Sequence, residues 1–333
     1  MKAAFYEKKG LATDVLLIGD IPTPEPGFGE VKVKVFVSAI NPSDTKTREG
    51  WGGNTEMPYP CIIPHNDGAG RIESVGVGVP QERIGERVWI FEAQLNGRAF
   101  GTAAEYVVIP SENAVRLPDN ASFDDGASLG VPGMTAHRLL FADGAIHGKR
   151  ILVQGGAGSV GHLAVQLAHW AGAQVIATVS SDSQAEIAKA CGASLVLNYK
   201  TDDVAREICN FTGKENSIDR IVEVAFVKNL DLDARVLAPN GIISTYAIDE
   251  DPSHPPAVNL QQLVPKDVTV HFTLVYSMPK AAHEAAALDL NAAIEVGALK
   301  PRIAKRFALD EIIKAHELLG TGGAGGKVLI DIK

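Results

Sequence analysis

Alternation between polar and apolar positions dominates the first third of the chain. Over residues 30–41, polar and apolar side chains alternate at first and the later positions are all apolar, as in a strand that enters a core. Shorter runs of the same kind follow at 70–79, 86–91 and 104–109. Glycines and prolines interrupt the chain between these runs. Short strands with frequent turns predict a compact β domain, barrel-like or sandwich-like, over residues 1 to about 120.

From residue 149 onward, strand patterns alternate with helix patterns. We expect strands at 149–154, 174–180, 194–199, 219–225 and 241–247, and helices at 161–172, 182–192, 203–212 and 229–238. This alternation predicts a parallel sheet with helices on both faces. The tail, with a strand-like run at 268–276, a helix at 280–295 and a last strand at 327–332, is expected to return to the first domain.

Composition narrows the class of protein. The chain has 333 residues, 46% hydrophobic and 21% charged, which excludes a disordered chain and suggests two domains. The net charge of −9 argues against a nucleic-acid partner. Three cysteines make no disulfide framework and favour a reducing cytoplasm. No apolar run reaches the roughly 20 residues that span a bilayer, so no membrane partner is expected.

A glycine-rich turn at 154–161 carries the most specific chemistry. It contains G-x-G-x-x-G at Gly156, Gly158 and Gly161, and it leaves a predicted strand and opens a predicted helix. The first glycine permits a tight turn, the second lets the backbone approach a pyrophosphate, and the third allows the helix to pack on the strand. The helix N-terminus then favours phosphate. The alternative is a glycine-rich turn without a ligand.

The residue type at the end of the second strand of this sheet distinguishes a site for NADPH from a site for NADH. An NAD site usually places a carboxylate there to bind the ribose hydroxyls. Ser180 and Ser181 occupy the position, and hydroxyls accept a 2′-phosphate that a carboxylate would repel. Asp182 follows and leaves NADH as an alternative cofactor, although an aspartate at this position also fits the first turn of a helix. Tyr199, after the third strand, is either an adenosine contact or an ordinary core-edge tyrosine.

Several motifs are distributed along nearly the whole chain. They are AINPSD at 39–44, HNDGAGRIESVG at 65–76, GERVW at 85–89, GTAAEYVVIP at 101–110, GMTAHRLL at 133–140, AGSVG at 157–161 and GKVLI at 326–330. Together they resemble the medium-chain dehydrogenase/reductase superfamily, in its zinc-free quinone oxidoreductase (zeta-crystallin-like) branch. The resemblance implies an α/β protein: a discontinuous, β-rich GroES-like catalytic domain (1–122 and 266–333) and a Rossmann domain with a doubly wound parallel sheet (123–265). It places the nucleotide in the cleft between them.

The resemblance also implies the cofactor contacts, residue by residue. Many relatives carry a lysine four residues after the serine of the second strand, where this chain has Gln184, which weakens the NADPH argument without reversing it. The expected cofactor-binding residues are Asn41, Thr135, Gly156, Ala157, Gly158, Ser159, Val160, Gly161, Ser180, Ser181, Tyr199, Phe272, Leu274 and Lys327.

Zinc-dependent relatives use a cysteine just after the first core strand, where this chain has Asn41. Cys61, His65 and Asp67 offer three donors, but they sit in one short loop without a distant anchor, so we expect no metal. Without a metal, hydride donation to an already electrophilic acceptor is easier than alcohol oxidation. The candidate catalytic hydrogen-bond donors are Asn41, Thr45, Lys46 and His65, and no general acid is named.

Three hypotheses for function follow. The first is an NADPH-dependent reductase of quinones, without zinc. The second is reduction of the C=C bond of enones, enals or acryloyl compounds. The third is an NADPH-binding structural protein that has lost turnover. By resemblance, the chain forms a homodimer or homotetramer through the Rossmann sheet edge near 272–276.

Overall fold

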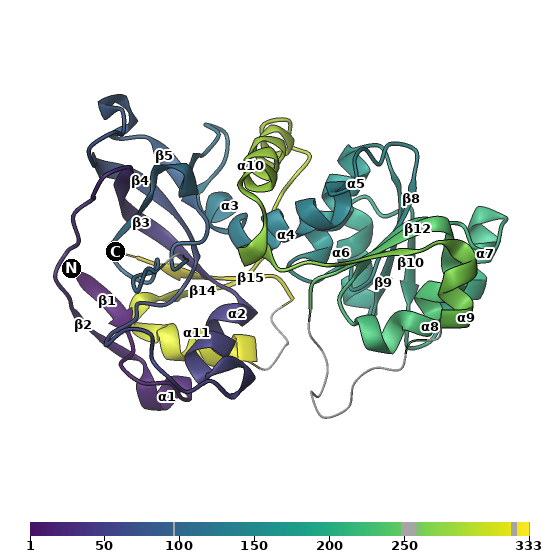
Figure 1. Ribbon diagram of the computed structural model, residues 1–333, viewed down its shortest axis with the longest axis horizontal. Coiled ribbons are helices and arrows are strands. Elements are labelled where there is room, and N and C mark those ends of the chain that lie inside the picture. The colour runs from purple at the N-terminus through teal and green to yellow at the C-terminus, as the bar shows by residue number, and fades with distance from the viewer. Residues whose placement is uncertain (96, 248–257, 259, 321–324, 333) are drawn as a thin grey trace. The chain divides into compact units, whose positions relative to one another are not determined.

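The computed structural model describes residues 1–95, 97–247, 258, 260–320 and 325–332. The chain forms two compact units. Unit 1 consists of Met1–Val131 together with Pro301–Lys333, and unit 2 is Pro132–Lys300 (Figure 1).

Unit 1 is built on a seven-stranded sheet in the order β14-β15-β3-β4-β5-β7, with β6 also paired to β3, and β1 and β2 form a separate two-stranded sheet. The strands are β1 (Lys2–Phe5), β2 (Leu17–Asp20), β3 (Glu30–Ile40), β4 (Asp67–Val75), β5 (Arg87–Ile90), β6 (Tyr106–Pro110), β7 (Ala114–Arg116), β14 (Ile303–Ala308) and β15 (Lys327–Asp331). The helices are α1 (Ala12–Val15), α2 (Pro42–Glu49), α3 (Phe123–Ala127) and α11 (Ile312–Gly320), with short 3₁₀ turns at Trp51–Gly53, Gln81–Arg83, Ser111–Asn113 and Leu309–Glu311.

The long central strand β3 organises unit 1. Its alternating valines, from Val31 to Val37, are buried, and its last residues are buried on both faces, as the change of pattern predicts. β3 pairs antiparallel with β4, β6 and β15. The register sets Asp67 opposite Ala39 and Val328 opposite Ile40. The first residue of β15 therefore lies beside the residue that follows β3.

Unit 2 contains a parallel six-stranded sheet in the order β10-β9-β8-β11-β12-β13. Its strands are β8 (Arg150–Val153), β9 (Gln174–Val179), β10 (Leu195–Asn198), β11 (Ile218–Glu223), β12 (Leu237–Thr245) and β13 (Thr269–Phe272). Its helices are α5 (Gly161–Trp170), α6 (Asp182–Ala190), α7 (Val204–Thr212), α8 (Phe226–Val236), α9 (Leu260–Leu263) and α10 (Lys280–Glu295), with 3₁₀ turns at Val264–Lys266 and Val275–Ser277. Helix α4 (Gly130–Phe141) starts at the boundary of the two units.

The strand order explains how the helices cover this sheet. The chain moves from β8 outward to β9 and β10, then crosses to β11 and continues outward to β12. Because parallel crossovers are right-handed, the two directions place helices on opposite faces. Helices α5 and α6 contact each other and β9, whereas α7 contacts α8 (Figure 1). The predicted doubly wound arrangement is confirmed.

The second domain boundary differs from the expected one. Residues 266–300 belong to unit 2, whereas the sequence pattern placed them with the β-rich domain. The run 268–276 is also shorter as a strand than predicted, because β13 ends at Phe272 and a 3₁₀ turn follows. Since β13 pairs in parallel with β12, its backbone hydrogen bonds extend the six-stranded sheet. The chain returns to unit 1 only at Pro301, and the first crossing lies after Val131 rather than at 122.

Candidate functional site

The glycine-rich turn lies between β8 and α5, at the carboxyl edge of the parallel sheet. Gly158 is exposed, whereas Gly156 and Ala157 are buried, and Ser159 and Val160 are half-buried. Helix α5 begins after Val160 without a side-chain cap. An uncapped helix N-terminus presents backbone N–H groups and the positive end of the helix dipole, which suits a phosphate.

The space around the three glycines tests whether a dinucleotide fits. A Cβ on Gly156 would lie 2.7 Å from Cβ of Ala177, and one on Gly161 would lie 2.1 Å from the carbonyl oxygen of Gly155, so both close packings require glycine. A Cβ on Gly158 would meet only the Gly155 oxygen, at 3.4 Å. Open space at the second glycine, with tight packing at the other two, is the arrangement that a pyrophosphate needs.

Ser180 follows β9 and lies next to Tyr199. Strand β10 pairs in parallel with β9, with Asn198 opposite Val179, so the two residues after these strands are neighbours. The backbone N–H and Oγ of Ser180 both donate to Oε1 of Gln184, each at 2.9 Å. Ser181 caps α6 by accepting from the backbone N–H of Gln184. The structure thus brings together both serines and Tyr199, whose side chain is exposed.

The remaining predicted cofactor residues of unit 2 lie elsewhere in it. Thr135 is buried within α4. Phe272 ends the edge strand β13, is 75% exposed, and contacts Phe226 edge-on with ring centroids 5.5 Å apart. Leu274 is also exposed. Two apolar side chains exposed at one end of an edge strand are suited to cover a ligand or a second subunit.

Asn41, Asp67 and Lys327 form a buried cluster in unit 1. Nζ of Lys327 donates to Oδ1 of Asn41 (2.5 Å) and to Oδ2 of Asp67 (2.9 Å), and Nδ2 of Asn41 donates to the same Asp67 oxygen (2.8 Å). The backbone N–H of Val131 also donates to Asp67. These contacts fix the orientation of the Asn41 amide. Both the oxygen and the nitrogen of the Asn41 amide are therefore hydrogen-bonded within the cluster.

Asn41 is also the N-cap of α2. Asp44 completes a capping box, since its Oδ2 accepts from the backbone N–H of Asn41 at 2.7 Å. Nδ2 of Asn66 donates to the other carboxyl oxygen of Asp44. Burial, with the charge of Asp67 as the second cause, raises the pKa of Asp44 to about 7. The start of α2 therefore holds an acid that titrates near neutral pH beside the Asn41 cluster.

Thr45 and Lys46 are positioned differently from Asn41. The hydroxyl of Thr45 is buried and donates to the carbonyl of Pro42 within its own helix. Lys46 is exposed, and its ammonium lies 5.5 Å from the ring centroid of Trp51. Hydrogen bonding within α2 occupies the Thr45 proton, so Lys46 has the more accessible donor.

His65 belongs to a chain of hydrogen bonds whose direction can be derived. Thr102 Oγ1 donates to the carbonyl of Asp67 (2.6 Å), so it accepts from Ser38 Oγ (2.7 Å). Ser38 has then used its hydroxyl hydrogen, so its 2.8 Å contact with His65 requires a proton on Nδ1. His65 Nε2 consequently accepts from Nε2–H of His316 (3.0 Å). His316 Nδ1 is left as a buried lone pair without a partner among the described residues.

Both imidazoles of this chain are neutral at pH 7. Burial lowers the pKa of His316 to about 3, with the charge of Arg48 as the second cause. Burial also lowers the pKa of His65 well below its usual value, followed by the effects of His316 and Lys327. His65 has φ 80, an unusual backbone conformation for a residue other than glycine, and its two hydrogen bonds hold it there. Both ring nitrogens of His65 are therefore hydrogen-bonded within the protein, and neither is free to donate to a substrate, the role expected from the sequence.

We expect the stability of unit 1 to fall as the pH decreases below about 6.5, because the unfolded chain binds protons there that the buried His316 does not. Taking its folded pKa of about 3, this histidine alone costs about 2–3 kcal/mol at pH 4.5. His316→Gln keeps a donor for His65 and should flatten the acid side of the stability profile. Urea unfolding at several pH values measures this, with the exposed His147→Gln as control. A His316→Gln profile parallel to that of the unaltered protein would contradict the assignment.

Unit 2 contains a buried pair of carboxyl groups, Asp233 and Glu223, that was not apparent from the sequence. Burial raises the pKa of Asp233 and of Glu223, and each carboxyl lies within hydrogen-bond reach of the other, so the pair shares a proton. Gln154 Nε2 donates to Asp233 (3.1 Å), and Gln154 Oε1 accepts from Thr178 (2.6 Å). The first residue of the glycine-rich turn is thus fixed by this pair. Two acids ten residues apart, one ending a strand and one within a helix, gave no local signal of contact.

The three donors considered for a metal do not converge. His65 is bonded to Ser38 and His316, Asp67 to Asn41 and Lys327, and Cys61 is a half-buried free thiol. Within the part of the chain that the structure describes, no three His, Cys, Asp or Glu side chains gather as metal ligands do. Over the same residues, no helix is both long and apolar enough to cross a bilayer.

Comparisons with known proteins cover both units. Residues 27–119 match the family model described as alcohol dehydrogenase GroES-like domain, and residues 159–292 match the one described as zinc-binding dehydrogenase. A quinone oxidoreductase from Lama guanicoe is 31% identical over 100% of this chain and 98% of its own length. A 2-haloacrylate reductase from Burkholderia is 29% identical, covering 98% of each chain. A solved structure of a mycobacterial protein complexed with NADPH has a TM-score of 0.82 at 26% identity, covering 99% of both chains.

Proposed function

The chain belongs to the zeta-crystallin-like quinone oxidoreductase branch of the medium-chain dehydrogenase/reductase superfamily, and on that premise we propose that it transfers hydride from NADPH to a quinone. Its oxidoreductase class follows from the family. The observation that carries the proposal is the turn at 154–161, where open space at Gly158 lies beside an uncapped helix N-terminus. The mycobacterial protein complexed with NADPH supports the choice of cofactor.

Within this proposal, the residues of unit 2 hold the dinucleotide. Ser159, Val160 and the first turn of α5 receive the pyrophosphate, and Ser180, Ser181 and Tyr199 receive the adenosine phosphate. When bound, the nicotinamide supplies the hydride. Lys200, which directly follows Tyr199 and is exposed, supplies the positive charge that Gln184 does not. No sequence motif singled out Lys200, because it is one exposed lysine among many polar residues.

Ser180→Asp should invert the nucleotide preference. A carboxylate after β9 repels the 2′-phosphate and binds the ribose hydroxyls of NADH. We expect kcat/KM for NADPH to fall by about two orders of magnitude, and that for NADH to rise, since like charges in contact cost several kcal/mol. Gln184→Lys should act in the opposite direction by adding a cation. Equal losses with both nucleotides would contradict the role of Ser180.

In unit 1, Asn41 and Lys327 act on the acceptor side of the reaction under this proposal. The ion pair with Asp67 holds the Lys327 ammonium and the Asn41 amide in one orientation, so donors for a developing oxyanion are in place before reaction. Lys46 is the exposed donor of the same segment. The proton that completes reduction then comes from water or from Asp44, whose carboxyl is still partly protonated near pH 7.

Two other functions make different predictions. The 2-haloacrylate reductase relative favours reduction of an activated C=C bond as the second candidate. A structural NADPH-binding protein would bind the nucleotide without turnover. Steady-state oxidation of NADPH and NADH with 1,4-benzoquinone, 9,10-phenanthrenequinone and an enal, each with and without chelator, separates the three. Quinone turnover that survives the chelator supports the proposal, and turnover with the enal alone supports the second candidate.

We also propose that the protein is a homodimer or homotetramer joined at the edge of the six-stranded sheet. Strand β13 is the last strand in that sheet, so one of its backbone edges has no neighbouring strand within the described residues. Phe272 and Leu274 are exposed at this edge. An exposed edge with large apolar side chains commonly pairs with a second chain.

A further inference from the structure

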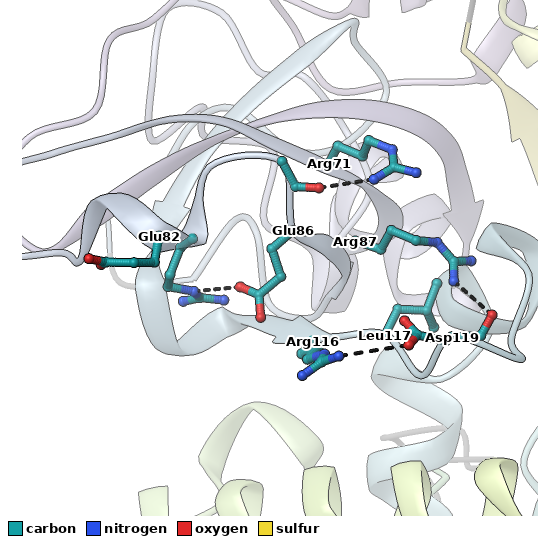
Figure 2. A pocket seen from close by; sticks show the side chains of 9 residues that line it. Arg71, Glu82, Glu86, Arg87, Arg116, Leu117 and Asp119 are labelled. Carbon is teal, nitrogen blue, oxygen red and sulfur yellow. Dashed lines mark hydrogen bonds and ion pairs between the residues drawn. The ribbon is translucent and has the colours of Figure 1, made fainter.

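A cavity in unit 1 is lined by four arginines and lies among β4, β5 and β7, on residues other than those assigned to the redox site. Its volume is about 490 Å³, within the range of small-molecule sites. Arg71, Arg83, Arg87 and Arg116 line it, with the buried Leu117 at one wall (Figure 2). The chain as a whole has a net charge of −9, so a local excess of guanidinium groups is unexpected.

The acidic residues of the cavity do not neutralise all four arginines. Glu86 accepts from Nε of Arg83 at 2.7 Å, which makes a closed pair, and Arg83 gives its other donors to Ser111 and Ala114. Asp119 lies 3.9 Å from Arg116, and both are largely exposed, so this contact is weak. Glu82 is exposed at the rim.

Of the four arginines that line the cavity, Arg71 and Arg87 have no carboxylate partner among the described residues. They are opposite each other in the antiparallel pairing of β4 with β5, a position in which two like charges repel. Both guanidinium groups lie over the ring of Phe123, at 5.9 and 4.9 Å from its centroid. Stacking on the ring orients them and leaves their N–H edges for other partners.

The two guanidinium groups differ in how many donors they keep. Arg87 donates to the carbonyls of Pro118, Asp119 and Ala121, which anchors it. Arg71 donates from Nη1 to the carbonyl of Gly85 at 2.9 Å, and this is the one hydrogen bond of its side chain among the described residues (Figure 2). An arginine has five N–H groups, so Arg71 keeps a fork of donors at the cavity.

We propose that this cavity binds an organic phosphate, with Arg71 holding the phosphate group bidentately and Arg87 and Arg116 adding positive charge. A multiply charged phosphate would relieve the repulsion between Arg71 and Arg87, which a neutral ligand would not. Planar guanidinium forks match phosphate oxygens in geometry. The site is separate from the proposed hydride transfer and does not depend on it.

Calorimetric titration of the full chain with inorganic pyrophosphate, in the presence of saturating NADPH, tests the proposal. We expect binding with one site per chain, weakened at least about fivefold in Arg71→Gln through loss of the charged fork. Arg71→Lys should retain part of the affinity. Glu82→Gln should tighten binding about twofold to threefold, because it removes a negative charge from the rim. Arg206→Gln, an exposed arginine on α7, is the matched control and should bind as the unaltered protein does.

The outcomes are distinct. No saturable binding at millimolar pyrophosphate overturns the proposal. So does an equal affinity in Arg71→Gln and Arg206→Gln, which would mean binding elsewhere. Pyrophosphate that binds only without NADPH, and ignores Arg71, belongs to the glycine-rich turn and also overturns it. Because Glu82→Gln predicts a gain, the proposal remains testable even if Arg71→Gln fails to fold.

Discussion

Asp67→Ala is expected to lower the free energy of unfolding of unit 1 by about 3–5 kcal/mol, the cost of leaving a buried charge without its partner. Lys327 is 2% exposed and Asp67 is 0% exposed, so water cannot replace the lost carboxylate. The substitution also removes the acceptor for Asn41 Nδ2 and for the N–H of Val131. Urea unfolding measures the change, followed by the fluorescence of Trp51 and Trp89 in unit 1, with Trp170 of unit 2 replaced by phenylalanine in every variant.

A double-mutant cycle separates the ion pair from the rest of this effect. Lys327→Met alone strands the Asp67 carboxylate, and the double variant Asp67→Ala with Lys327→Met removes both charges. We expect the double variant to lose less stability than the sum of the two single variants, with a coupling of about 1–3 kcal/mol. Additive losses would show that the charges do not interact in the folded protein.

Two glycine substitutions should damage the nucleotide site in different ways. Gly158→Ala places a methyl group in open space, 3.4 Å from the nearest backbone oxygen, so folding should be unaffected. The methyl group occupies the approach of the pyrophosphate, and we expect KM for NADPH to rise at least about tenfold. Gly161→Ala creates a 2.1 Å contact with the Gly155 carbonyl, which should cost about 1–3 kcal/mol of stability as well as binding.

Thermal unfolding and NADPH titration of both variants check these expectations. Gly320→Ala is a suitable control, since a methyl group there meets nothing within 4 Å. If the Gly158→Ala protein binds NADPH normally, the turn is not part of the nucleotide site. A Gly158→Ala protein that is as unstable as Gly161→Ala would show that the second glycine serves packing.

Local signals in the sequence predicted most of the individual elements. The alternation over 30–41 becomes β3, and the helix expected at 203–212 is α7, with Asp203 as its cap and Gly213 as its end. These features depend on residues close in the chain, through side-chain period and capping. The turn at 154–161 was recognisable for the same reason.

Contacts between distant segments were not predictable in the same way. The tail strand at 268–276 was expected to return to the first domain. Because β propensity does not select a partner, only its pairing with β12 decided the boundary. Lys327 was expected among the cofactor contacts, but no local pattern indicated that the register of β15 on β3 would bring it to Asn41 and Asp67. His316, in a helix far along the chain, gave no sign that it would bond to His65.

Under the proposed function, the protein transfers hydride from NADPH to a quinone without a bound metal ion. The most direct test is an anaerobic single turnover of chelator-treated protein with NADPH and 9,10-phenanthrenequinone, followed by the near-ultraviolet absorbance of the reduced nicotinamide. We expect that one NADPH is consumed for each quinone reduced, and that Ser180→Asp slows this reaction. Nucleotide that stays reduced with the quinone present, or oxidation that returns only when a transition-metal ion is restored, would contradict it.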